Sequence, residues 1–146
     1  MDPRDVLKNI YLFRDATPQD LAAVAAIAEE KVYIGGEYIY RPNEIPDALY
    51  VVESGTIDIT IKDKDLPLAS VASGQSLGEL AFFDRGARAA SAVAREATHV
   101  LRLPFAKLDQ VFAEHPALAT EFYRRACVFL AQLLRTIAPD LNSRYF

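Results

Sequence analysis

The chain has 146 residues, of which 51% are hydrophobic, and it carries a formal net charge of −4 with no run of Lys or Arg. These values indicate one folded domain with one core over residues 1–146, and they exclude a disordered chain. Because a phosphate backbone is bound by a basic patch, they also argue against a chain that binds nucleic acid by itself.

Cysteine content and hydropathy bear on where the protein works. Cys127 is the single cysteine, which excludes an internal disulfide and agrees with a reducing compartment. No apolar run reaches the roughly 18 residues of a membrane span, and the charged N-terminus MDPRDVLKNI lacks the apolar core of a signal peptide. We therefore expect a cytoplasmic protein that enters no membrane, with Cys127 in its core.

Residues 3–30 have the pattern of helices. The stretch VLKNIYLF fits a short helix, and TPQD begins a longer one. Thr17 can cap this longer helix, Pro18 suits its first turn, and Asp20 favours the positive end of the helix dipole. Apolar residues then follow on one face at helical spacing, namely Leu21, Val24, Ala25 and Ala28.

Between residues 31 and 103 the apolar period changes to two, which is typical of strands. YIGGEYIYR predicts two strands around a Gly-Gly turn, and ALYVVESGTIDITIKDKD predicts a hairpin that turns at Gly55. KDKD, residues 62–65, predicts the next turn. PLASVAS, ASAVAR and ATHVLRL predict further strands. About six to eight short antiparallel strands indicate a small β-barrel or jelly roll.

Residues 104–138 predict two helices, one over FAKLDQVFAEH and one from about Pro116 to Ile137. The second helix has an apolar stripe of Ala119, Phe122, Ala126, Phe129, Leu133 and Ile137, with Val128, Leu130 and Leu134 outside it. A helix that is apolar on two sides covers its own core and something else, either a ligand or a twin helix. The fold class is therefore expected to be α+β and mainly β, with N-terminal helices and two C-terminal helices around the barrel.

The loop GELAFFDRGARAAS, residues 78–91, carries residue types that suit a sugar phosphate. The guanidinium of Arg88 is always charged and fits phosphate oxygens in a forked geometry. Ala89, Ala90 and Ser91 are small, so that a ligand can approach backbone N–H groups, which also bind anions.

The start of this loop supplies complementary groups. Gly78 suits an unusual backbone angle or a close approach, and the carboxylate of Glu79 can accept a hydrogen bond from a sugar hydroxyl. The next four residues, Leu80, Ala81, Phe82 and Phe83, are expected to anchor the loop as a short helical turn. One end of the loop would thus hold the phosphate and the other the ribose.

The segments Gly78-Glu79-Leu80-Ala81 and Arg88-Ala89-Ala90-Ser91 together resemble the phosphate-binding cassette of cyclic nucleotide-binding domains. This family includes bacterial catabolite activator proteins, regulatory subunits of protein kinase A and cyclic-nucleotide-gated channels. The resemblance extends to SGQSLGE and to Gly36, Ile39, Glu44, Tyr50, Val51, Val52 and Gly55. The chain departs from the family pattern at Ala87, Asn43 and Ala92, where Pro, Gly and a larger apolar residue are frequent.

The resemblance implies a non-catalytic receptor for a cyclic mononucleotide that requires no cofactor. Arg88 would bind the cyclic phosphate and Glu79 the ribose 2′-hydroxyl. Gly78 and the amides near Ala81, Ala89 and Ala90 would complete the pocket. Because cGMP-selective members often carry Thr or Ser at the position of Ala89, the alanine favours cAMP over cGMP.

The resemblance also implies that the final helix lies over the base and changes position when the ligand binds. Gln132, Leu133 and Arg135 are its candidate contacts. Only PDLNSRYF follows this helix, too short for the helix-turn-helix of the transcription factors in the family. We expect either a stand-alone sensor or part of a longer chain, acting on an unidentified downstream protein, with a homodimer through the final helix as an option.

Other interpretations have weaker support. GQSLG, residues 74–78, matches the G-x-S-x-G hydrolase motif, but that motif needs a large parallel sheet. Two isolated histidines, His99 and His115, supply no metal-ligand cluster, so neither a metal site nor a metal-dependent enzyme is expected. The open alternative is the same fold used as a protein-interaction module, or as a receptor for another nucleotide such as cyclic di-GMP.

Overall fold

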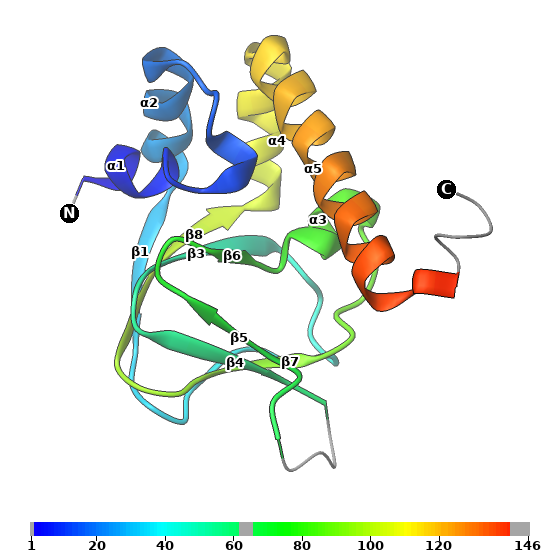
Figure 1. The fold of residues 1–146 in the computed structure, drawn as a ribbon. Helices are drawn as coiled ribbons and strands as arrows, with labels where there is room; N and C mark the ends of the chain where they lie inside the picture. Colours follow the sequence, from blue (N-terminus) through cyan, green and yellow to red (C-terminus); the bar gives the residue numbers. More distant parts are fainter. Residues whose placement is uncertain (1, 62–65, 141–146) are drawn as a thin grey trace.

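The computed structural model describes residues 2–61 and 66–140 (Figure 1). Its helices are α1 (Pro3–Leu7), the 3-10 helix η1 (Tyr11–Phe13), α2 (Pro18–Ile27), α3 (Glu79–Asp84), α4 (Phe105–Glu114) and α5 (Pro116–Ile137). Its strands are β1 (Glu29–Tyr33), β2 (Tyr38–Tyr40), β3 (Ala48–Ser54), β4 (Thr56–Thr60), β5 (Ala69–Ala72), β6 (Ser76–Leu77), β7 (Ser91–Ala94) and β8 (Thr98–Pro104).

The strands form two four-stranded antiparallel sheets with the orders β1-β8-β3-β6 and β2-β7-β4-β5. Apolar side chains from both sheets share one buried cluster, which includes Tyr50, Ile57 and Ala92. The predicted α+β, mainly β architecture is confirmed, and it resembles a jelly roll. In the described part of the chain the strand pairs do not close into a barrel.

The predicted hairpin across Gly55 is wrong. β3 pairs with β6 and β8, whereas β4 pairs with β5 and β7, so the chain crosses from one sheet to the other at this glycine. Gly55 has φ +94°, and a Cβ there would lie 2.5 Å from Thr98 Oγ1. With this backbone angle, a single residue turns the chain from one sheet into the other. The strands before and after it therefore do not pair with each other. The turn predicted at residues 62–65 lies outside the described residues.

The N-terminal helices differ from prediction in their boundaries. The cap of α2 is confirmed, because Thr17 Oγ1 accepts a hydrogen bond from the Asp20 backbone N–H at 3.1 Å. The stretch VLKNIYLF does not form one helix but is divided between the end of α1 and η1.

Two strands also differ from prediction. β1 begins at Glu29, two residues earlier than expected, where the Glu29 carboxylate accepts a hydrogen bond from Arg102 of β8 at 2.8 Å. β6, within SGQSLGE, was not predicted.

A second core lies between the first sheet and the helices. Phe122 of α5 is fully buried there, with its ring centroid 4.9 Å from that of Phe112 and 5.3 Å from that of Phe13. Figure 1 shows the helices gathered at one end of the sheets, with α5 running past α3. Although α5 is long, no helix within the described residues combines the length and apolarity that crossing a membrane requires.

The C-terminal half of α5 is less buried than its apolar residues suggested. The buried residues of the helix are Leu118, Phe122 and Ala126, whereas Leu134 and Ile137 are 41% and 67% exposed. Cys127 is exposed, so its predicted place in the core is wrong. It follows Ala126 directly and is therefore turned by about 100° from the buried stripe.

Candidate functional site

A hollow of about 370 Å³, here called the cassette hollow, opens between α3, the loop after it and the second sheet. It is lined by Tyr40, Ile59, Val71, Ser76, Leu77, Gly78, Glu79, Leu80, Ala81, Asp84, Ala87, Arg88 and Ala89. The fold therefore brings together six of the predicted site residues, Gly78, Glu79, Leu80, Ala81, Arg88 and Ala89, around one cavity.

Gly78 links the two ends of the cassette. Its backbone is left-handed, with φ +81°, between β6 and α3. A Cβ at this position would lie only 2.7 Å from Arg88 Nη1. Instead, the Gly78 carbonyl accepts a hydrogen bond from Arg88 Nη1 at 3.0 Å. Both the backbone angle and the close approach of the guanidinium therefore require glycine.

The guanidinium of Arg88 is buried, and the residue is only 8% exposed. Its Nη2 donates to the Ala48 carbonyl at 2.6 Å, and its Cζ lies 4.0 Å from the centroid of the Tyr40 ring. In the described part of the chain it forms no ion pair, and its Nε is buried without a hydrogen-bond partner. Arg88 therefore places a positive charge beside the cavity, and its Nε is a donor without a partner.

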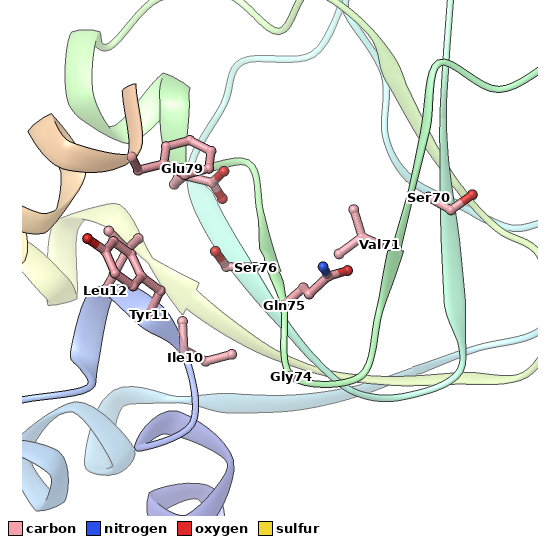
Figure 2. Close-up of a pocket in the computed structure, with 10 residues that line it drawn as sticks. Ile10, Tyr11, Leu12, Ser70, Val71, Gly74, Gln75, Ser76 and Glu79 are labelled. Carbon is pink, nitrogen blue, oxygen red and sulfur yellow. The ribbon is translucent and has the colours of Figure 1, made fainter. Parts of the chain in front are cut away.

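Glu79 places a carboxyl group, which can accept hydrogen bonds, at the same cavity. Burial raises the pKa of its carboxyl, and a hydrogen bond with Ser76 and the charge of Arg88 counter that effect only in part. The oxygen Oε2 is buried without a partner among the described residues. Figure 2 shows the carboxylate directed toward Ser76. Glu79 therefore offers an unused acceptor at the same cavity.

α3 is anchored on the side away from the cavity. Its Phe82 is fully buried against Phe105, with 5.2 Å between the ring centroids. Arg85, at its C-terminus, places its guanidinium 4.5 Å from the Phe82 ring and donates to Asp109 of α4 at 2.7 Å. The predicted helical turn over residues 80–83 is thus confirmed, and it is fixed to α4. Leu80 is 49% exposed, however, so its predicted part in anchoring the turn is wrong.

The remaining predicted residues lie elsewhere. Ala90 and Ser91 line a neighbouring hollow of about 500 Å³, of which Ala89 is also part. Leu133 is half-buried on α5 and lines neither this hollow nor the cassette hollow. The other two candidate helix contacts, Gln132 and Arg135, are exposed.

Another hollow, of about 280 Å³, adjoins Glu79 and is shown in Figure 2. Its walls come from η1, from the turn between β5 and β6, and from Phe129 of α5. Sequence reasoning missed Tyr11 and Phe129 here, and Tyr40 in the cassette hollow. Phe129 belonged to the predicted apolar stripe, which was the available signal for it.

The geometry does not assemble the parts of a serine hydrolase. Ser76 lines both of these hollows beside the Glu79 carboxyl. His115 lies between α4 and α5 with its Nδ1 3.1 Å from Asp20 Oδ1, and His99 is exposed on β8. Neither histidine lines a hollow to which Ser76 contributes.

Comparison with known proteins gives one match to a family model, that of the cyclic nucleotide-binding domain, over residues 30–115. The human potassium/sodium hyperpolarization-activated cyclic nucleotide-gated channel 2 is 26% identical over 98% of this chain and 17% of its own length. The cAMP-dependent protein kinase regulatory subunit of Blastocladiella emersonii is 27% identical over 90% of this chain and 33% of its own. The chain thus spans less than two thirds of these relatives.

A solved structure extends the comparison to the fold. The N-terminal domain of a transcriptional regulator from Streptomyces coelicolor A3(2) matches with a TM-score of 0.78 and 28% identity. The match covers 88% of this chain and 94% of that one. Because residues 29–104, which contain the described strands, make up only about half of the chain, the shared architecture includes helices as well.

Proposed function

The chain belongs to the cyclic nucleotide-binding domain family, and we propose that it is a non-catalytic receptor for a cyclic mononucleotide, with cAMP as the preferred ligand. The observation that carries this proposal is a pair of unused polar atoms. Three side-chain atoms in the described residues are buried without a partner, and two of them, Arg88 Nε and Glu79 Oε2, belong to residues that line the cassette hollow.

The two atoms match two parts of a cyclic nucleotide. Arg88 Nε is a charged donor and suits a phosphate oxygen. Glu79 Oε2 is an acceptor and suits the ribose 2′-hydroxyl, which donates. Buried polar atoms are almost always hydrogen-bonded in folded proteins, so a ligand that satisfies both atoms would remove two unfavourable burials.

The preference for cAMP depends on residues around these two atoms. Ala89 has no hydroxyl that could bind guanine, and it lines the cassette hollow next to Arg88. One relative is named as a regulatory subunit of a cAMP-dependent protein kinase. In this proposal Gly78, Leu80 and Ala81 shape the cassette hollow, while Ala90, Ser91 and Leu133 contact the ligand from outside it.

We further propose that α5 changes position on binding. Its buried residues end at Ala126, and residues 127–137 are half-buried or exposed, so they have less packing to lose than the first half of the helix. A ligand shifts the helix only as far as it binds the shifted state more tightly. Hydrogen exchange with and without cAMP tests this step. We expect slower exchange in residues 127–137 with ligand, and equal exchange throughout α5 would contradict it.

Calorimetric titration of the purified chain with cAMP, cGMP and cyclic di-GMP tests the ligand itself. We expect cAMP to bind with a micromolar or lower Kd. Arg88→Ala should weaken binding about ten- to hundredfold, because it removes a charge-assisted contact worth roughly 1.5–3 kcal/mol. Arg95→Ala is the matched control, since Arg95 pairs with Asp58 on the surface outside the hollow.

The titration also separates the alternatives. Binding of cyclic di-GMP alone would identify another nucleotide as the ligand. No binding of any of the three would favour a protein-interaction module, whose downstream partner would then be sought directly. Sedimentation of the chain with and without cAMP would show whether α5 supports a homodimer.

A further inference from the structure

We propose that Tyr40 is a positioning residue for Arg88: the face of its ring holds the guanidinium in the orientation in which Arg88 meets the ligand. Tyr40 lies on β2 and lines the cassette hollow together with Arg88. The effect on ligand affinity rests on the proposed function, whereas the placement of the guanidinium is a property of the free protein.

Three different elements hold the guanidinium. Tyr40 of β2 covers one face, with 4.0 Å from Cζ to the ring centroid. The Gly78 carbonyl before α3 and the Ala48 carbonyl of β3 each accept one hydrogen bond from a terminal nitrogen, at 3.0 and 2.6 Å. The hydrogen bonds hold the two terminal nitrogens, and the ring lies against the central carbon, so the three contacts together define one orientation.

The ring also stabilises a charge that lacks a counter-ion. Arg88 is absent from the ion pairs of the described residues, although it is only 8% exposed. The electron-rich face of an aromatic ring attracts a cation, and the attraction is strongest where water is excluded. Tyr40 therefore replaces part of the stabilisation that a carboxylate would give, and it leaves Nε available.

Tyr40 is itself well fixed. It pairs with Ala92 of β7, a few residues after Arg88, and its ring contacts that of Tyr50 at 6.2 Å between centroids. Tyr50 is buried and lies opposite Arg102 in the first sheet. Arg102 joins β1 to the loop before β3 through Glu29 and Asp47. Burial raises the pKa of Tyr40 to about 12, so its ring stays neutral beside the cation at physiological pH.

The ligand-free protein gives the first test. In a chain labelled with 15N-arginine, the Arg88 Nε–H proton should show an upfield ring-current shift and slow exchange with water. Tyr40→Phe should keep this signal and Tyr40→Leu should lose it. Tyr33→Leu, a change at a half-buried tyrosine of the same inter-sheet core that does not line the hollow, should leave it unchanged. An unchanged Arg88 signal in Tyr40→Leu would overturn the proposal.

Titration with cAMP gives the second test. We expect Tyr40→Leu to weaken binding about tenfold, because the guanidinium must then be oriented as the ligand binds, and Tyr40→Phe to restore it. In an Arg88→Ala background the same Tyr40→Leu change should have less than about a twofold effect, because the two residues act as a unit. Equal losses in both backgrounds would assign Tyr40 a role independent of Arg88 and overturn the proposal.

The two tests fail separately. If the native chain does not bind cAMP, the proposed function fails. The Arg88 signal then still shows whether Tyr40 sets the orientation of the guanidinium. If cAMP binds but Tyr40→Phe is as weak as Tyr40→Leu, the ring face is not what Tyr40 contributes, and the inference fails while the proposed function stands.

Discussion

The first part of the cassette, residues 78–88, and the last part of α5, residues 127–137, both border the hollows around Glu79, but they are held very differently. The cassette contains the buried Phe82, a glycine in a required backbone conformation and an arginine bonded to two carbonyls. The end of α5 has no buried residue among those described. One wall of the candidate site is preformed and the other is loosely packed.

This difference suggests a division of labour. A preformed wall lowers the entropy that a ligand loses when it is bound. A loosely packed wall can adopt a second position for a small difference in free energy, which a ligand can supply. Four substitutions would test the contrast, from the largest expected effect to the smallest.

Phe82→Ala should lower the free energy of unfolding by about 3–5 kcal/mol, the usual effect of removing a buried phenylalanine. Its ring contacts those of Phe105, Phe112, Phe122 and Tyr123, so the cavity would open at the centre of the helical core. Urea denaturation measures the effect. A loss below about 1 kcal/mol would mean that the cassette is not anchored as described.

Gly78→Ala should be destabilising by about 2–3 kcal/mol, because it combines a strained left-handed angle with a clash against Arg88 Nη1. Gly74→Ala is the matched control, since Gly74 also has a left-handed angle, φ +85°, but nothing lies within 4 Å of its Cβ position. The control should lose only about 1–2 kcal/mol. If both variants lost the same free energy of unfolding in urea denaturation, the clash with Arg88 would not contribute to the requirement for glycine at position 78.

Glu79→Gln should stabilise the ligand-free chain at pH 7, by on the order of 1 kcal/mol. Burial raises the folded pKa of Glu79 above its ordinary value of 4.5. The native chain is therefore expected to lose stability as the pH rises from that value through the folded pKa, and Glu79→Gln should not show this loss. Urea denaturation across pH measures it, with the exposed Glu30→Gln as control. Parallel pH profiles for all three proteins would contradict the prediction.

Leu134→Ala should change the free energy of unfolding by less than about 0.5 kcal/mol, as an exposed position does. The same denaturation measurement that detects the loss in Phe82→Ala should find almost none here. A loss above about 1 kcal/mol would show that the end of α5 is packed in solution, and the contrast between the two walls would disappear.

The candidate site was predictable from sequence where its residues are close along the chain. Gly78, Glu79 and Arg88 lie within one loop, and their order carries the chemistry. Tyr40 and Phe129 reach the hollows through the pairing of β2 with β7 and the path of α5. Neither packing relation follows from local periodicity. Tyr40 therefore gave no signal, and the only signal for Phe129 was its place in the apolar stripe.

The errors in the fold have a similar origin. The period of two identified the strands at Ile57 and Val51, but it does not state which strands pair, and the expected hairpin across Gly55 proved to be a crossing between sheets. Apolar spacing likewise could not show how many turns of α5 pack against the core. Cys127 was therefore expected inside and is exposed.

The pairing of β1 with β8 has a consequence for the order of folding. Glu29 lies opposite Arg102 in the first sheet, so this sheet closes only after most of the chain is available. Pairing over such sequence distances slows folding, because the intervening chain must lose entropy before the contact forms. During synthesis, α2 can form early, but the sheet beneath it must wait until β8 has left the ribosome.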